Sequence, residues 1–103
     1  MKVKSKRNLS SDKIVRVAEI LKTIGHPIRL QVLGLLELNE PMNVSEIQEN
    51  IEVTVEQSLL SHHLIKMKDK GLLRSEKEGM RVYYRLADRQ ILNIFDCMEK
   101  CDI

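Results

Sequence analysis

The sequence predicts one small, mainly α-helical domain that carries a single β-hairpin, in the order ααααββα. Three observations predict this fold. Apolar residues recur at helical spacing along most of the 103 residues, capping signals divide that pattern into separate helices, and a short alternating stretch interrupts it near the end. Hydrophobic residues make up 43% of the chain and aromatic residues only 3%, so aliphatic side chains must fill the core.

The chain begins with a basic segment. Residues 1–9 hold four basic side chains: Lys2, Lys4, Lys6 and Arg7. Since this segment has little to bury, we expect a flexible arm that precedes a folded domain over residues 10–103. The sequence leaves open whether the arm is a solvated tail or contacts phosphate groups.

A glycine and a proline divide the first two helices. After Ser10, apolar residues recur at the spacing of one helix face: Ile14, Val17, Ala18 and Leu21. Gly25 suits the end of a helix, and Pro27 suits the first turn of the next one. We therefore expect a first helix from Ser10 to near Gly25, and a second from about Pro27 to Leu38.

A short third helix is predicted after Pro41. Asn43 is followed three residues later by Glu46, which resembles a capping box, in which each residue bonds the backbone N–H of the other. This helix should run from Val44 to about Ile51.

The fourth helix has the clearest pattern. Thr54 and Gln57 form a second apparent capping box, and Gly71 closes the helix. One face is apolar, through Leu60, Leu64 and Met67. The outer side should therefore be polar.

Helical spacing is lost between Leu72 and Leu86. After Gly79, apolar and polar residues alternate, as in a half-buried strand. This pattern predicts a hairpin with its tip at Glu78 and Gly79. A last helix should begin at Ala87, with one apolar face formed by Ile91, Ile94, Phe95 and Met98.

Two helices with a tight connection, followed by a charged hairpin, are the elements of a winged helix-turn-helix, a fold that places one helix in the DNA major groove. The outer side of the fourth helix would carry hydrogen-bonding residues suited to base edges and phosphates: Gln57, Ser58, Ser61 and His62. Three further cations could bind backbone phosphates: Lys66, Lys77 and Arg81. We therefore expect double-stranded DNA as the partner.

Two other interpretations stand beside this one. Polar residues on an amphipathic helix often form only a solvated face, and a net charge of +2 gives the chain no strong overall field. The fold could then serve as a protein-interaction module without sequence-specific DNA reading. The sequence shows no Gly-rich phosphate loop and no recognisable catalytic set, so we do not expect an enzyme.

Three phrases in the sequence resemble the ArsR/SmtB family of bacterial repressors. They are GHPIRLQVLGLL (25–36), SLLSHHLIKMKDKGLL (58–73) and VYYRL (82–86), and the resemblance covers about residues 12–101. It implies a repressor that binds an inverted-repeat operator as a homodimer. The first and last helices would form the dimer, the fourth would enter the major groove, and the hairpin would be the wing. His63 matches a usual family histidine, which we interpret as support for the helix rather than a base contact.

The resemblance also implies release of DNA by an effector, often a metal, but the usual metal ligands are largely missing. Residues 41–45, where the family has a cysteine pair, contain none. In the last helix, Asp88 lacks its neighbouring histidine, and Cys101 stands at a later histidine position. We therefore expect no required cofactor and no defined metal site.

Cys97 and Cys101 are the remaining effector candidates. A spacing of four places both thiols on one side of a helix. They are either packed as small apolar side chains, or respond to oxidants or thiophilic metals. Two cysteines do not form a disulfide framework, and no apolar run is as long as a membrane span. We expect a cytoplasmic protein without membrane contact.

Overall fold

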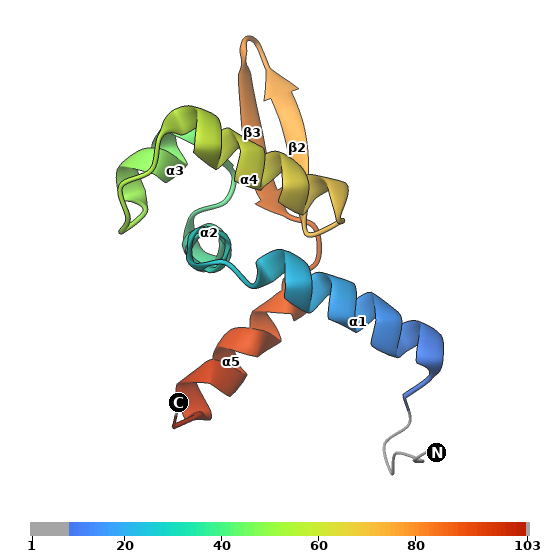
Figure 1. Cartoon of the computed structure of the whole chain (residues 1–103). Coiled ribbons are helices and arrows are strands. Elements are labelled where there is room, and N and C mark those ends of the chain that lie inside the picture. Colours follow the sequence, from blue (N-terminus) through green and yellow to red (C-terminus); the bar gives the residue numbers. More distant parts are fainter. Residues whose placement is uncertain (1–8, 103) are drawn as a thin grey trace.

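The computed structural model describes residues 9–102, so the arm predicted for residues 1–9 lies outside the described residues except for Leu9. In the described part, helices pack against the base of a small sheet, and its hairpin projects away from them (Figure 1). The elements are α1 (Ser11–Ile24), α2 (Pro27–Asn39), β1 (Met42–Asn43), α3 (Val44–Asn50), α4 (Gln57–Asp69), β2 (Leu73–Glu78), β3 (Arg81–Leu86), η1 (Arg89–Leu92) and α5 (Asn93–Lys100). The predicted order of four helices, a hairpin and a last helix is confirmed.

The first three helices start close to where the sequence predicts them. The Ser10 hydroxyl caps α1 by accepting from the backbone N–H of Lys13, and Pro27 occupies the first turn of α2. At α3 the capping box is complete. Asn43 Oδ1 accepts from the backbone N–H of Glu46 at 2.9 Å, and Glu46 Oε1 accepts from that of Asn43 at 3.0 Å.

The capping box predicted for α4 is wrong. This helix begins at Gln57, and its N-cap Glu56 makes no side-chain capping bond. The reason lies in contacts with α3. Val55 is buried, and its carbonyl accepts from Gln48 Nε2 at 2.9 Å, so the chain stays extended past Thr54.

The C-terminal end of α4 follows the prediction. The backbone N–H groups of Gly71 and Leu72 bond the carbonyls of Lys68 and Met67, the pattern of a Schellman motif. Gly71 has a φ of 82°, a conformation that favours glycine. This turn delivers the chain directly into β2.

The sheet has one strand more than the sequence predicts. Its order is β1-β3-β2, and the two-residue β1 pairs antiparallel with β3, Met42 opposite Tyr84. At the hairpin, Glu78 pairs with Arg81, so the tip is Gly79 and Met80 rather than Glu78 and Gly79.

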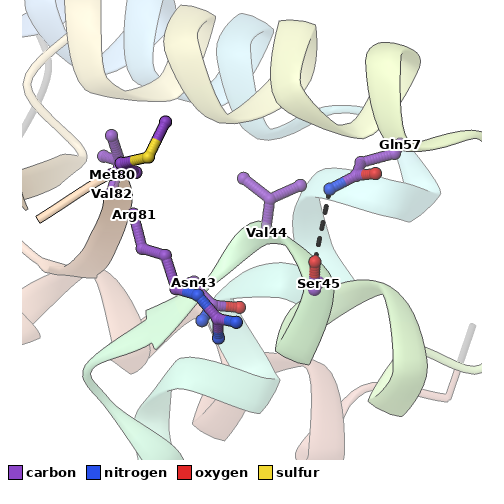
Figure 2. Close-up of a pocket in the computed structure, with 7 residues that line it drawn as sticks. All are labelled: Asn43, Val44, Ser45, Gln57, Met80, Arg81 and Val82. Carbon is purple, nitrogen blue, oxygen red and sulfur yellow. Dashed lines mark hydrogen bonds between the residues drawn. The ribbon is translucent and has the colours of Figure 1, made fainter.

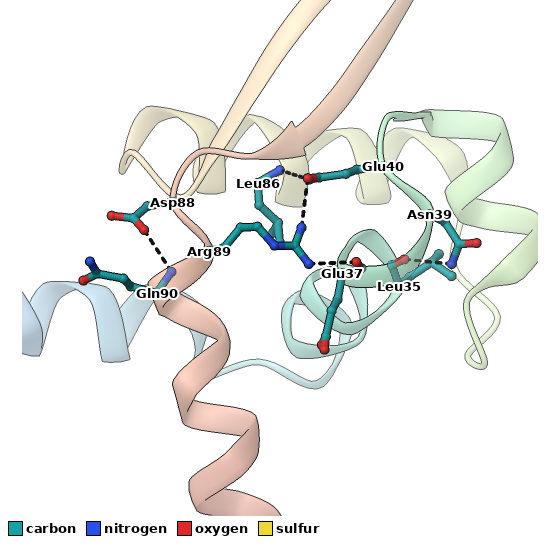
Figure 3. Close-up of polar contacts among 8 residues, drawn as sticks. All are labelled: Leu35, Glu37, Asn39, Glu40, Leu86, Asp88, Arg89 and Gln90. Atoms are coloured by element: carbon teal, nitrogen blue, oxygen red, sulfur yellow. Dashed lines mark hydrogen bonds and ion pairs between the residues drawn. The ribbon is translucent and has the colours of Figure 1, made fainter.

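The last helix begins later than expected. Residues 89–92 form the short η1, capped by Asp88, whose carboxylate accepts from the backbone N–H of Gln90 at 2.9 Å (Figure 3). Arg89 turns back toward α2, where it bonds the Glu40 carboxylate and the Glu37 carbonyl. These bonds hold the chain at the base of the hairpin before α5 starts at Asn93.

The core lies between α2, α3, α4 and the sheet. Fully buried side chains from the helices include Val32, Leu33, Leu36, Ile47, Leu60, Leu64 and Met67. In contrast, α1 and α5 project from the side of the molecule away from the hairpin (Figure 1). Only the last turn of α1 is buried, and α5 has no buried residue.

Candidate nucleic-acid interface

Helix α4 has a buried side and an exposed side, divided as its apolar spacing predicts. Leu60, His63, Leu64 and Met67 are buried against the core. Four of the predicted site residues on this helix are exposed, namely Gln57, Ser58, His62 and Lys66. The fifth, Ser61, is partly buried. The structure thus presents this whole set on the outer side.

Two apolar side chains on α4 are also exposed, which the sequence analysis did not single out. Ile65 is 49% exposed and Leu59 is 47% exposed. An apolar residue on the outer side of a helix departs from the simple amphipathic pattern. The exposed side of α4 is therefore a mixture of hydrogen-bonding and apolar groups.

A groove separates the start of α4 from the hairpin tip (Figure 2). Its lining comes from β1, α3, α4 and the hairpin: Asn43, Val44, Ser45, Gln57, Met80, Arg81 and Val82. Within it, Gln57 Nε2 donates to Ser45 Oγ over 3.3 Å. The sequence analysis did not identify Ser45 as a groove residue, because no local sequence pattern distinguishes it. The groove brings Gln57 and Arg81, two predicted site residues, to one part of the surface.

The two predicted cations of the hairpin lie on opposite faces of the ribbon. Lys77 pairs with Val82, and Arg81 pairs with Glu78. Because side chains alternate between faces along a strand, these two pairs point to different sides. Both cations are exposed, so the hairpin offers one positive charge on each face near its tip.

His63 is 5% exposed and lies on the buried side of α4. Its Nδ1 accepts a hydrogen bond from Arg29 Nε at 3.0 Å, and its ring lies 4.4 Å from that of His26. Arg29 also donates to the carbonyl of Thr23 at 2.9 Å. Burial, followed by the nearby His26, Arg29 and His62, lowers the pKa of His63. The neutral ring is therefore favoured, and the structure confirms a supporting role.

Neither cysteine is packed in the chain as described. Cys97 in α5 and Cys101 at its end are both exposed, free thiols. Among residues 9–102, no group of three or more His, Cys, Asp and Glu side chains lies close enough to hold a metal ion. Asp88 caps η1 with its carboxylate.

Comparisons with known proteins agree with this arrangement. A family model described as "Bacterial regulatory protein, arsR family" matches residues 26–75. The transcriptional repressor PagR of Bacillus anthracis is 35% identical over 77 residues, which span 75% of this chain and 75% of PagR. The chain belongs to the ArsR family. This membership makes it a DNA-binding transcriptional regulator rather than an enzyme.

Solved structures show the same fold as this ArsR-family chain. HlyU from Vibrio cholerae superposes with a TM-score of 0.76 at 26% identity, covering 88% of this chain and 96% of HlyU. A homodimeric winged helix-turn-helix DNA-binding domain, Mb0332 from Mycobacterium bovis, gives a TM-score of 0.72 at 27% identity over 96% of this chain and 87% of that domain. The fold is therefore a winged helix-turn-helix, in which α3 and α4 are the two helices of the helix-turn-helix and the hairpin of β2 and β3 is the wing. A search of the described residues found no helix with the length and apolarity to span a membrane.

Proposed function

We propose that this chain is a repressor that binds an inverted-repeat operator as a homodimer, with α4 in the major groove and the wing on the neighbouring DNA backbone. The observation that carries the proposal is the exposed side of α4, which presents Ser58, Ser61 and His62 together. Gln57 at the start of this side and Arg81 on the wing border the same groove.

Each of these residues has a suitable partner in DNA. Serine, glutamine and histidine bond base edges or phosphates, and Gln57 retains a carbonyl and a second N–H beyond its bond to Ser45. Lys66 at the end of α4 suits a phosphate, as do Lys77 and Arg81 on the two faces of the wing. In this proposal, α4 supplies specificity and the cations supply affinity that falls with salt.

The exposed faces of α1 and α5 support a homodimer. Ile14, Val17 and Leu21 follow one another on α1 and are 50%, 41% and 50% exposed, and Met98 on α5 is 48% exposed. An apolar stripe of this kind is costly in water and favours burial against a partner. The Mb0332 domain, which has the same fold, is homodimeric.

The control of DNA binding belongs to the proposal as well. No cofactor is needed for the contacts above, and Cys97 and Cys101 are exposed on the helix that would lie at the dimer interface. Oxidation or a thiophilic metal at these thiols would change that interface and release DNA. A Cys97→Ser, Cys101→Ser variant should then bind DNA equally with and without diamide or zinc. If the variant responds as the parent does, the effector acts elsewhere or the thiols are inert.

Gel shifts on an operator selected from random DNA test the binding itself. We expect parent binding to weaken steeply as salt rises, and a Ser61→Ala, His62→Ala variant to lose its preference for the selected sequence. If the parent selects no sequence at low salt, the alternative of a protein-interaction module is favoured. Because the target is chromosomal DNA, the proposal also locates the protein in the cytoplasm.

A further inference from the structure

Ile65 is an apolar residue in the middle of the recognition surface of α4. At about 100° per residue, its direction on the helix differs from that of Ser58 by about 20° and from that of Ser61 by about 40°. It is nevertheless 49% exposed, whereas the apolar residues that face the core from α4 are fully buried. A surface that contacts Ser58 and Ser61 therefore also contacts Ile65.

The base edges in the major groove carry few apolar groups. The largest apolar group is the C5 methyl group of thymine, and most of the other groups are hydrogen-bond donors and acceptors. An isoleucine pressed against donors and acceptors would leave them without partners, which is costly. Against a thymine methyl, both apolar surfaces leave water, which is favourable.

We propose that Ile65 contacts the methyl group of a thymine in each half-site, beside the bases that Ser61 reads. The sequence requirement at that position then comes from apolar contact rather than from hydrogen bonds. This inference rests on the proposed function, since it needs α4 to lie in the major groove.

Leu59 provides a matched control on the same helix. It is 47% exposed, almost the same as Ile65, but six residues apart at about 100° each place the two about 120° apart around α4. Leu59 thus lies on the flank of the helix, away from Ser58. Its nearest neighbours around the exposed side are Lys66 and His62. Truncating Leu59 therefore removes a similar amount of exposed apolar surface away from Ser58, Ser61 and Ile65.

The test replaces each thymine of the selected operator in turn by deoxyuridine, which removes only the methyl group. We expect one position in each half-site at which this change weakens parent binding about fourfold, the loss of one buried methyl group. Ile65→Ala should bind thymine and uridine operators equally. Leu59→Ala and Ile65→Val should still bind more weakly when that thymine is replaced by deoxyuridine. Thermal unfolding checks that each variant is folded.

Three outcomes would overturn this inference, and only the first would also overturn the proposed function. A parent that selects no DNA sequence overturns both. A parent that selects an operator, yet is insensitive to uridine at every position, overturns the inference alone. So does a uridine effect that persists undiminished in Ile65→Ala, because the methyl group would then be read by another residue.

Discussion

Arg29 Nε donates a hydrogen bond to Nδ1 of His63 over 3.0 Å, which joins α2 to α4. The same guanidinium donates to the carbonyl of Thr23 in α1. One side chain therefore ties the helix proposed for dimerisation to the helix proposed for DNA reading. The bond needs a neutral imidazole, because a doubly protonated ring has no lone pair to accept it.

The first prediction concerns stability at low pH. In the unfolded chain His63 takes up a proton as the pH falls below 6.5, whereas its pKa in the folded chain is lower, mainly through burial. The unfolded state then binds more protons in this window, so the free energy of unfolding should fall as pH drops below 6.5. Urea unfolding at about pH 7.5 and about pH 5.5, on either side of the ordinary histidine value, measures the fall.

His62 supplies the control for this effect, since it is the exposed neighbour of His63 on the same helix. We expect His62→Gln to keep most of the parent's loss of stability between the two pH values, because His62 is the smallest of the causes that lower the pKa of His63. His63→Gln should lose less, because glutamine can accept from Arg29 but does not titrate. An equal loss in both variants would show that the pH dependence arises at other groups.

The second prediction concerns Glu40, which connects the end of α2 to the base of the wing (Figure 3). Its carboxylate accepts from the backbone N–H of Leu86 at 2.7 Å and from Arg89 at 2.9 Å. Glu40→Ala leaves the Leu86 N–H without this acceptor and should lower the free energy of unfolding by about 1–3 kcal/mol. Denaturant unfolding measures the change.

Glu37→Ala is the comparison for Glu40. Arg89 contacts Glu37 through its backbone carbonyl, so removing the Glu37 side chain leaves that bond in place. We expect this variant to unfold within about 0.5 kcal/mol of the parent, as ordinary surface substitutions do. Equal losses for the two glutamates would contradict a specific role for Glu40.

The third prediction concerns the proposed homodimer. Leu21→Glu introduces a charge into the apolar stripe of α1, and it should convert the dimer to a monomer at micromolar concentration, because a charge buried without a partner is costly. Lys22→Glu changes the charge of the adjacent exposed residue by more and should leave the dimer intact. Sedimentation equilibrium distinguishes the two, and a Leu21→Glu dimer as tight as the parent would place the interface elsewhere.

The fourth prediction concerns the wing. Arg81→Ala should weaken binding to all DNA sequences alike and lower the slope of log affinity against log salt by about one, the value of a single phosphate contact. Lys13→Ala removes an exposed cation from α1, on the side of the molecule away from the wing, and should leave the slope unchanged. A change of sequence preference in Arg81→Ala would instead indicate base contact.

The sequence predicts those features that depend on neighbours along the chain. The Asn43 and Glu46 box is such a feature, because both partners lie within one turn, and so is the outward placement of Ser58 and His62 on α4. The similar box at Thr54 and Gln57 does not form. There, contacts from α3 to the carbonyl of Val55 and to the Gln57 amide outweigh the local preference.

Features that depend on contacts between distant segments cannot be predicted from local sequence patterns. A strand of two residues has no detectable alternation, and β1 exists because Met42 and Asn43 pair with β3 some forty residues later. The groove that brings Ser45 beside Gln57 and Arg81 has the same origin. The role of Ile65 could not be predicted from local patterns either, since the role of an exposed apolar residue depends on which residues share its surface.

The most direct test of the central claim is a footprint of the parent protein on its selected operator. We expect two protected half-sites in inverted orientation, about one helical turn or a multiple apart, as a two-fold dimer requires. We also expect both protections to vanish together in the Ser61→Ala, His62→Ala variant. A single protected half-site, or protection that this variant retains with the same sequence preference, would contradict this claim.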